Sequence, residues 1–546
     1  MLLFRACVSG RPIQCIPDPS AKTVYVFEKK RVSRRRSLPQ SPNRNARRRK
    51  ELLLPGIWIA AASLSLTGCA YLPKDSKPAI PMAPPAMAAT VASVAPEAVS
   101  ITAEWPQNFW WRGLKCPELD QVLHLALTSN PDLRATLDRV HQAWAMAAGA
   151  RSRYLPSSGV RPWLANSVFG VWGFPGSSFF GPFGGNSFLF WDIIPTFTNY
   201  HVDLWGEDRA RVRAAIGEAR AEESEVAVAR LLLGATVARR YVRLVAAEEE
   251  LRLARQRESI AGELLSLSQV RGSRGVDSLF PVHTAEERLE TARQDVAGLE
   301  RECQTLRHEI ARLAGQGPDW GKALVISEAS FPRRFPLPER IAFDLLGHRP
   351  DVAVACWRAQ AAANQLKIAK TEFYPNLNLV AWFGFQTLNF STLFLNPALP
   401  LMYMIGPAIT LPIFQGGRLT AQLETVAEEY HIAVERYNSV LLSALQQVAD
   451  SLAYWQEAAK DLEAQERAVK AAQANVDLSR RLFASGLNVR QDLLEMQYRL
   501  AEAETRLSVR HAQHVDSAVG LLVALGGGFE PATIPEWPRN ELSTVK

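Results

Sequence analysis

The chain has 546 residues, of which 47% are hydrophobic and 21% charged, and its formal net charge is +7. This apolar content excludes a chain that is disordered throughout. No run of 18 or more apolar residues follows residue 70, which argues against a bundle of membrane-spanning helices. Residues 1–68 hold 14 Lys and Arg but 3 Asp and Glu, so residues 69–546 carry −4 and no nucleic-acid partner is expected.

The N-terminal region has the pattern of an export signal. Basic residues at 47–50 precede an apolar run that ends at Leu66-Thr67-Gly68-Cys69. A cysteine at this place indicates a bacterial lipoprotein, cleaved before Cys69 and acylated on its thiol. An ordinary signal peptide or a short anchor is the alternative. Ala70, where an Asp would imply retention in the inner membrane, favours the outer membrane.

These features divide the N-terminal part into two segments. We predict a signal segment at 1–68, of which 1–45 exceed the length of an ordinary signal and suggest a misassigned start site. Residues 69–104 are rich in Pro, Ala and Ser, which predicts an extended tether between the lipid and the folded part.

The rest of the chain contains an internal repeat. Asn130-Pro131-Asp132 matches Arg349-Pro350-Asp351 at an offset of 219 residues. Three glycine pairs follow at offsets of 210 or 211: Gly206 with Gly416, Gly275 with Gly486, and Gly315 with Gly526. Chance matches would not keep such constant offsets, and a shorter loop in the second copy explains the step between them. We predict two structural repeats, at 105–338 and 339–529, followed by a C-terminal tail at 530–546.

Each repeat has the same internal order. A helical stretch comes first, then a segment with β character at about 157–205 or 376–414, and then a helical hairpin that turns at Gly275 or Gly486. The 70 residues from Gly416 to Gly486 lack proline and would span on the order of 100 Å as a helix. In this stretch a seam of apolar side chains is predicted at Val426, Tyr430, Ala433, Tyr437, Val440 and Ala444. Such a length favours a coiled coil or the wall of a tunnel over a compact domain.

The β segments alternate apolar and polar residues. In 403–413 the isoleucines share one face, with glycine, alanine and threonine on the other. This pattern fits a transmembrane strand with a lipid face and a lumen face, and equally a half-buried strand of a soluble protein. Four strands cannot close a barrel, and an open edge is not tolerated in lipid. If the strands span a membrane, several copies must share one barrel, which predicts a homo-oligomer.

Several ordered motifs resemble those of the TolC-like outer membrane factors, in particular their lipidated efflux channels. The motifs are Trp110-Trp111, Asn130-Pro131-Asp132-Leu133, Asp203-Leu204-Trp205-Gly206, Arg349-Pro350-Asp351, Phe373-Tyr374-Pro375, Leu411-Pro412-Ile413-Phe414-Gln415-Gly416-Gly417-Arg418 and Ala524-Leu525-Gly526-Gly527-Gly528. The resemblance implies a mainly helical fold with membrane β-strands. Three chains would each give four strands to a 12-stranded outer-membrane β-barrel and long helices to a periplasmic α-barrel. Its tip would dock a periplasmic adaptor coupled to an inner-membrane efflux pump.

The resemblance assigns the two hairpin turns to this tip. It predicts an adaptor-docking surface at Arg271, Arg274, Gly275, Val276, Gly486 and Leu487. The alternative is that the hairpins simply need a glycine for a left-handed turn.

The resemblance also implies an aperture closed by acidic side chains. Asp492 and Glu495 occupy the matching positions and share one helix face, so three copies would present rings of like charge that raise each other's pKa. An acidic first turn that offsets the helix dipole is the alternative for Asp492. The first repeat has Pro281 and Thr284 at the equivalent places, so no aperture contribution is expected from it.

No pattern for an enzyme, a cofactor or a metal site occurs. There is no phosphate-binding loop, HExxH or GxSxG, and His511 and His514 have no third ligand nearby. The cysteines left after Cys69, at Cys116, Cys303 and Cys356, form no CxxC and are expected to pack. The predicted function is the outer-membrane channel of a tripartite multidrug efflux system. The alternatives are a channel of this fold for protein secretion and a coiled-coil envelope lipoprotein without a pore.

Overall fold

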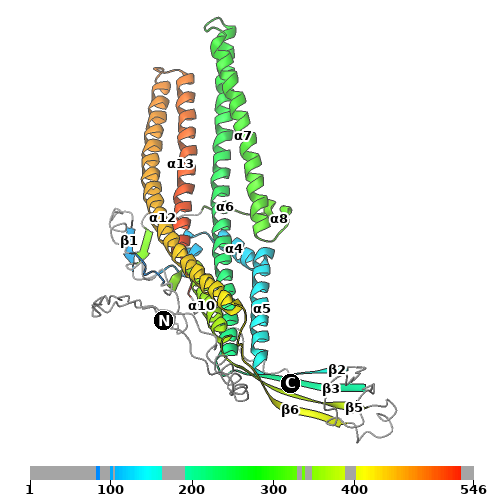
Figure 1. The fold of residues 1–546 in the computed structure, drawn as a ribbon. Helices are drawn as coiled ribbons and strands as arrows, with labels where there is room; N and C mark the ends of the chain where they lie inside the picture. Colours follow the sequence, from blue (N-terminus) through cyan, green and yellow to red (C-terminus); the bar gives the residue numbers. More distant parts are fainter. Residues whose placement is uncertain are drawn as a thin grey trace, which may run out of the picture.

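Long helices dominate the computed structural model, which describes residues 81–85, 99–102, 105–162, 191–328, 335–338, 347–387 and 401–530. The helices run along one axis, and a four-stranded sheet extends from one end of them (Figure 1). The predicted signal segment, Cys69 and the tail beyond residue 530 lie outside the described residues. Among the described helices, none combines the length and the apolar composition needed to cross a lipid bilayer.

Each half of the chain contains short helices, a pair of strands and a long helical hairpin. The helices are α4 (Pro117–Ser129), α5 (Pro131–Arg151), α6 (Glu207–Ser273), α7 (Phe280–Leu313), α8 (Pro318–Lys322), α10 (Pro350–Thr371), α12 (Arg418–Ala484) and α13 (Arg490–Ala524), with 3-10 helices η1 (Trp110–Leu114) and η2 (Ser152–Tyr154). The strands are β1 (Val99–Thr102), β2 (Ser157–Pro162), β3 (Trp191–Val202), β4 (Phe335–Pro338), β5 (Asn376–Thr387) and β6 (Leu401–Thr410).

The two long helices α6 and α12 are equivalent in length and in the way they begin. Each has 67 residues, about 100 Å of helix, and each follows a glycine cap with φ of +83°, at Gly206 and Gly417. The sequence match of Gly206 with Gly416 was therefore wrong by one residue. With Gly417 as the partner, the offset is 211 at both ends of these helices.

The C-terminal ends of the four hairpin helices, α6, α7, α12 and α13, share one hydrogen-bonding pattern. In each, the backbone N–H of the residue after a glycine donates to a carbonyl five residues earlier, at 2.8–3.0 Å. The donors are Val276, Gln316, Leu487 and Gly527. The glycines before them are those that the repeat pairs at an offset of 211, so each matched glycine marks the end of a helix.

The Asn-Pro-Asp and Arg-Pro-Asp motifs close the ends of the returning helices. The side-chain amide of Asn130 donates to the carbonyl of Leu313 at the end of α7, at 2.9 Å. The buried guanidinium of Arg349 donates to the carbonyl of Ala524 at the end of α13, at 2.6 Å. The last carbonyls of a helix have no partner within it, so both motifs satisfy groups that would otherwise be buried without one.

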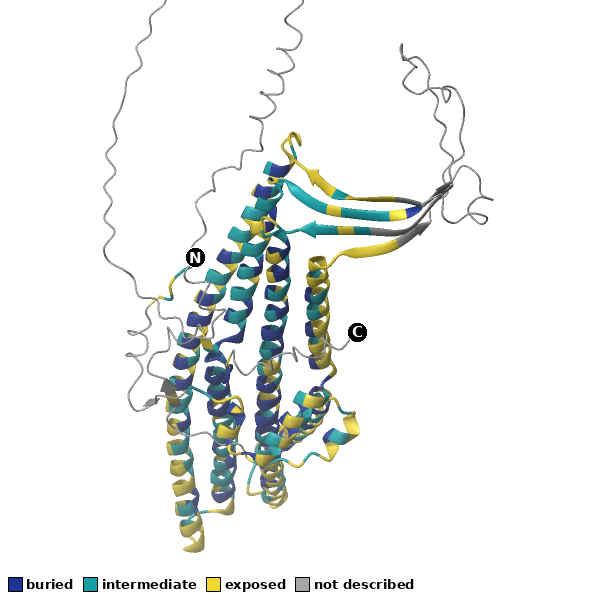
Figure 2. Ribbon diagram, turned by 90° about the horizontal axis from the view of Figure 1, so that it is seen from below, coloured by how far each residue is buried: buried dark blue, intermediate teal, exposed yellow. Residues whose placement is uncertain are grey.

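The main core lies where these helix ends meet the short helices and η1. Trp110 and Trp111 are buried there against α4 and α6. Trp455 of α12 is fully buried and packs on His514 of α13, with ring centroids 4.3 Å apart. Figure 2 shows buried residues along the surfaces where helices pack together and mostly exposed residues at the free helical ends.

The sheet and the helices beside it are arranged in the same order. The four strands pair antiparallel in the order β2-β3-β5-β6. The helices pack α5 on α6, α6 on α10 and α10 on α12, and we call this layer the wall. Both layers therefore have the first repeat on one side and the second on the other. Among the described residues, β2 and β6 each keep one edge unpaired, and α5 and α12 are the outer helices of the wall.

Candidate functional site

The free end of each long hairpin is a short turn with a left-handed glycine. Gly275 between α6 and α7 has φ of +71°, and Gly486 between α12 and α13 has φ of +69°. A side chain at either position would be strained, which accounts for both glycines by the local turn alone. Their geometry therefore gives no evidence of a partner.

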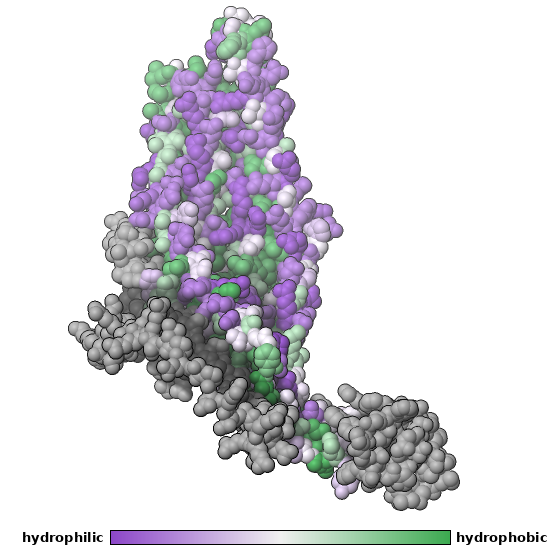
Figure 3. Space-filling model, viewed as in Figure 1, coloured by the Kyte–Doolittle hydropathy of each residue, from purple (hydrophilic) through white to green (hydrophobic). Residues whose placement is uncertain are grey.

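Exposed apolar side chains surround these turns. Val276, Leu279 and Phe280 are 63%, 68% and 79% exposed at the α6–α7 tip, and Leu487 is 77% exposed at the other. Figure 3 shows apolar residues at the end of the α6–α7 hairpin, beyond helices whose surface is largely hydrophilic. Apolar groups gathered at a free end are typical of a contact surface.

The two arginines predicted at the first tip differ in their contacts. Arg271 binds the carboxylate of Asp277 through two nitrogens, at 2.6 and 3.1 Å. This hydrogen bond from Arg271 lowers the pKa of Asp277 below its ordinary value. The charge of Arg271 is therefore balanced within the turn. Arg274 is exposed and makes no ion pair with the described residues, so it supplies the free positive charge of this tip.

The two predicted aperture acids lie in different environments. Asp492 is exposed in the first turn of α13. Glu495 is partly buried and accepts hydrogen bonds from Arg288 of α7 at 2.5 Å and from Arg499 at 3.2 Å. Burial raises the pKa of Glu495, but the hydrogen bonds and charges of the two arginines outweigh it and the net shift is downward. Within one chain, this is the opposite of the raised pKa expected in a ring of unpaired acids.

Arg288 was missed by the sequence analysis. Its guanidinium also lies over the ring of Tyr498, 3.7 Å from the centroid, and thereby joins the first hairpin to the second. Beside it, the side chains of a small core pack together from α6, α7 and α13: Ile260, Ala261, Leu264, Leu289, Leu494 and Tyr498. A contact between residues 207 positions apart leaves no local sequence signal, so no motif could have revealed it.

At the opposite end of the molecule, the sheet has an apolar face. Strand pairing places Leu377 opposite Ile409, and Ala381 opposite Ile405, so their side chains share a face. Ile405 and Ile409 are 72% and 70% exposed. No element within the described part of the chain covers this face. Exposed isoleucines on one face are what a lipid-facing strand requires.

A buried carboxylate joins the sheet to the helices in the first repeat. Asp208, in the first turn of α6, is 1% exposed. It accepts a hydrogen bond from Nε of Arg153 at 2.8 Å and lies 2.5 Å from Nδ1 of His201, at the end of β3. Close by, Trp205 stacks on Tyr374 of the second repeat, with ring centroids 4.9 Å apart. These contacts tie the end of β3 and the segment before β2 to the first turn of α6.

The two neighbouring histidines of α13 lie in different surroundings. His514 lies in the core against Trp455, whereas His511 lies 3.6 Å from the carboxylate of Glu328. No three His, Cys, Asp or Glu side chains within the described ranges are placed to hold a metal ion. Cys116 and Cys303 are buried, and burial raises the pKa of Cys303 to about 11.

Comparison with known proteins gives consistent matches. The family model described as "outer membrane efflux protein" matches residues 122–316 and 343–527. The fusaric acid resistance protein FusA of Burkholderia cepacia is 35% identical over 367 residues, 67% of this chain and 68% of FusA. The multidrug resistance outer membrane protein MdtP of Escherichia coli K12 is 25% identical over 494 residues, 88% of this chain and 97% of MdtP.

Solved structures show the same fold. The outer membrane protein VceC of Vibrio cholerae superposes with a TM-score of 0.69 at 28% identity, covering 78% of this chain and 100% of VceC. The CmeC outer membrane channel of Campylobacter jejuni has a TM-score of 0.72 at 20% identity, covering 85% of this chain and 96% of CmeC.

Proposed function

Because the chain belongs to the outer membrane efflux protein family, we propose that it is the outer-membrane channel of a tripartite multidrug efflux system. Its TolC-like fold and efflux role are those of its relatives. In this proposal the channel is a passive exit for small toxic compounds. An inner-membrane pump drives them into it through a periplasmic adaptor, and the channel itself performs no chemistry.

One observation supports a closed duct: the unpaired edges of the sheet and the outer helices of the wall lie on the same sides of the chain. The edges of β2 and β6 and the outer helices α5 and α12 lie on the same two sides of one chain. A second copy can pair its β2 with β6 while its α5 packs on α12, and repetition of this contact closes a ring. Three copies, the number that the family resemblance implies, would join 12 strands in one barrel.

A lipid anchor at Cys69 is consistent with the place where the tether meets the helices. The N–H of Met82 donates to Oδ1 of Asn438 on α12 at 2.8 Å. Asn438 lies 20 residues after Arg418, about 30 Å along the helix from the end that carries the sheet. The 13 residues from Cys69 to Met82 can span roughly 45 Å when extended. An acyl chain on Cys69 can thus reach the level of the strands.

The apolar tips are the proposed docking surface for the adaptor. Replacing Val276 by Ser should weaken adaptor binding about tenfold, because an exposed apolar contact is lost from the turn without a change in its backbone. Val325→Ser, at a 72% exposed position away from the tips, is the matched control. Pull-down of the purified adaptor by full-length channel would measure the effect, and equal binding by both variants would contradict tip docking.

Deletion of the gene tests the function as a whole. We expect greater susceptibility to several unrelated toxic compounds, restored by the intact gene; fusaric acid belongs in the panel because FusA is named for resistance to it. Unchanged susceptibility together with lost protein export would instead indicate a secretion channel. Purified protein that gives no conductance in planar bilayers would favour the envelope lipoprotein without a pore.

A further inference from the structure

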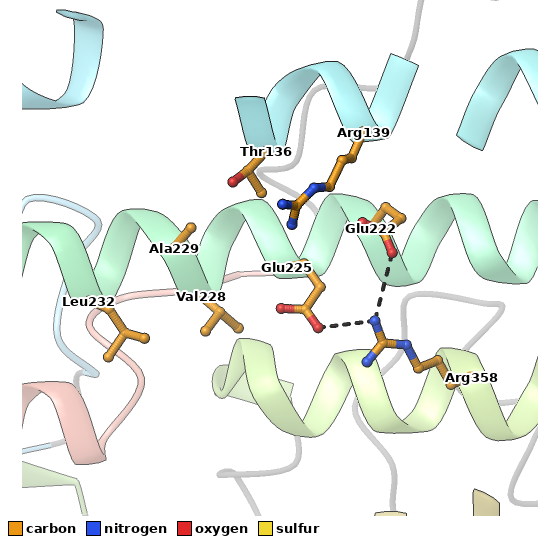
Figure 4. Close-up of a pocket in the computed structure, with 8 residues that line it drawn as sticks. All are labelled: Thr136, Arg139, Glu222, Glu225, Val228, Ala229, Leu232 and Arg358. Carbon is orange, nitrogen blue, oxygen red and sulfur yellow. Dashed lines mark ion pairs between the residues drawn. The ribbon is translucent and has the colours of Figure 1, made fainter. Parts of the chain in front are cut away.

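A pocket lies in the wall, between α5, α6 and α10. Its volume is about 350 Å³, within the range of sites for drug-sized ligands. Its lining residues, drawn in Figure 4, are Thr136, Arg139, Glu222, Glu225, Val228, Ala229, Leu232 and Arg358. The ionic side chains gather at one end, and the apolar residues of α6 form the other. The pocket is therefore amphiphilic.

The pocket opens on the face of the wall opposite the main core. Leu232 lines the pocket, whereas a Cβ at Gly234 would lie 3.7 Å from Trp110 in that core. Two residues along a helix correspond to a rotation of about 200°, so the two faces of α6 point in nearly opposite directions. If the main core and α4 faced the centre of the ring, they would occupy the space of the duct. In a closed duct the core therefore lies outside, and the pocket faces the interior.

The charges in the pocket are incompletely paired. The guanidinium of Arg358 lies 3.1 Å from the carboxylate of Glu225 and 3.7 Å from that of Glu222, so one positive charge serves two negative ones. Burial raises the pKa of Glu218, one turn earlier, despite the nearby charge of Arg358. Across the pocket, Arg139 is exposed and makes no ion pair with the described residues. On the α6–α10 side of the pocket, two carboxylates thus share one guanidinium, and Arg139 of α5 faces them as a free positive charge.

We propose that this pocket binds zwitterionic amphiphiles on the inner wall of the duct, which rests on the proposed function. A ligand carboxylate would bind Arg139, its ammonium group would bind Glu222 and Glu225, and its apolar body would cover Val228 and Leu232. A molecule with only one charge would leave part of this arrangement unpaired, so the zwitterion is favoured.

Ciprofloxacin and nalidixic acid are suitable probes, because both carry a quinolone carboxylate and only ciprofloxacin carries a basic amine. Binding to the full-length protein in detergent can be followed by the fluorescence anisotropy of the drug. Arg139→Gln should weaken both probes about tenfold, and Glu225→Gln should weaken ciprofloxacin alone by a similar factor. Arg151→Gln is the matched control, because it removes the same charge from α5 about 18 Å away, outside the pocket.

The pattern across the two probes decides the outcome. Circular dichroism of each variant excludes loss of folding as a cause. Ciprofloxacin binding that is absent in the wild type, or unchanged in both pocket variants, would overturn the proposal. Anisotropy does not depend on conduction or on an adaptor. A pocket that binds in a protein without conductance would thus count against the duct, and a conducting protein without binding would count against the pocket.

Discussion

Gly526 is the residue at which the end of the second hairpin comes nearest to the backbone before α10. A Cβ built on it would lie 2.0 Å from the carbonyl oxygen of His348, and its φ is +92°. Gly526→Ala should therefore cost at least about 3 kcal/mol of stability, because both the contact and the backbone conformation become unfavourable. Thermal unfolding of the full-length protein in detergent measures this. Gly298→Ala, in an open position within α7, should stabilise it by about 0.5–1 kcal/mol.

Glu495 gives a prediction with a defined pH dependence. Because its pKa is lowered by Arg288 and Arg499, its ionised form contributes stability above about pH 4.3, the ordinary value for Glu. This contribution is lost as the pH falls through the lowered pKa. Glu495→Gln should thus lower the free energy of unfolding at pH 7 by about 1 kcal/mol or less, and wild type and variant should converge in acid.

A control separates this contact from a general effect of charge. Glu463 pairs with Arg467 on the exposed surface of a single helix, so Glu463→Gln should change stability less than Glu495→Gln at pH 7. Equal effects of the two substitutions, or a difference that does not narrow as the pH is lowered, would contradict the role given to Arg288.

At the scale of elements, the two repeats join sheet to helix by different chemistry. The first uses the buried carboxylate of Asp208 with Arg153 and His201, whereas the second has an apolar cluster at the equivalent place, which includes Phe373, just before β5, and Leu419 of α12. Asp208→Ala should cost about 2 kcal/mol, because it removes the buried acceptor shared by Arg153 and His201. Faster proteolysis near this junction would report the loss, and Asp319→Ala, at an exposed pair on α8, should not change it.

The buried seam of α12 agrees only in part with the seam predicted from the sequence. The sequence predicts helix correctly over its whole length, and the predicted seam residue Ala444 is fully buried. Val434 and Leu441 are also fully buried, each one residue after the predicted Ala433 and Val440. The reason is that α12 packs on α10 near the sheet and on α13 farther along, so its buried stripe turns as the partner changes. Periodicity identifies a helix, but the partner decides which face is buried.

At the scale of the molecule, the proposed ring predicts a specific contact between copies. Leu137 on α5 is 41% exposed and Ile432 on α12 is 51% exposed. Each lies 14 residues, about 21 Å, from the end of its helix that carries the sheet. Leu137→Cys with Ile432→Cys, in a Cys356→Ala chain, should give covalent dimers and trimers on oxidation. Leu137→Cys with Leu478→Cys, far along α12, should not, and cross-linking in both would contradict the arrangement.

The architecture was largely predictable, but the contacts that hold it together were not. Glycine positions, repeat order and strand alternation follow from local backbone chemistry, and these predicted the hairpins and the strands. The parallel pairing of β1 with β4 and the contact of Arg288 with Glu495 depend on residues more than 200 positions apart. Such contacts arise only after the repeats pack, and a single sequence carries no periodic signal for them.

The equal length of α6 and α12 sets the same distance from the sheet to the tip in both repeats. One inserted residue would advance a tip by about 1.5 Å and rotate everything beyond it by about 100°, which would turn the buried stripe toward solvent. Seven residues, about 10 Å, would restore the seam. The length from the sheet to the tips can therefore change only in multiples of seven residues. The same insertion must occur in both repeats of the chain.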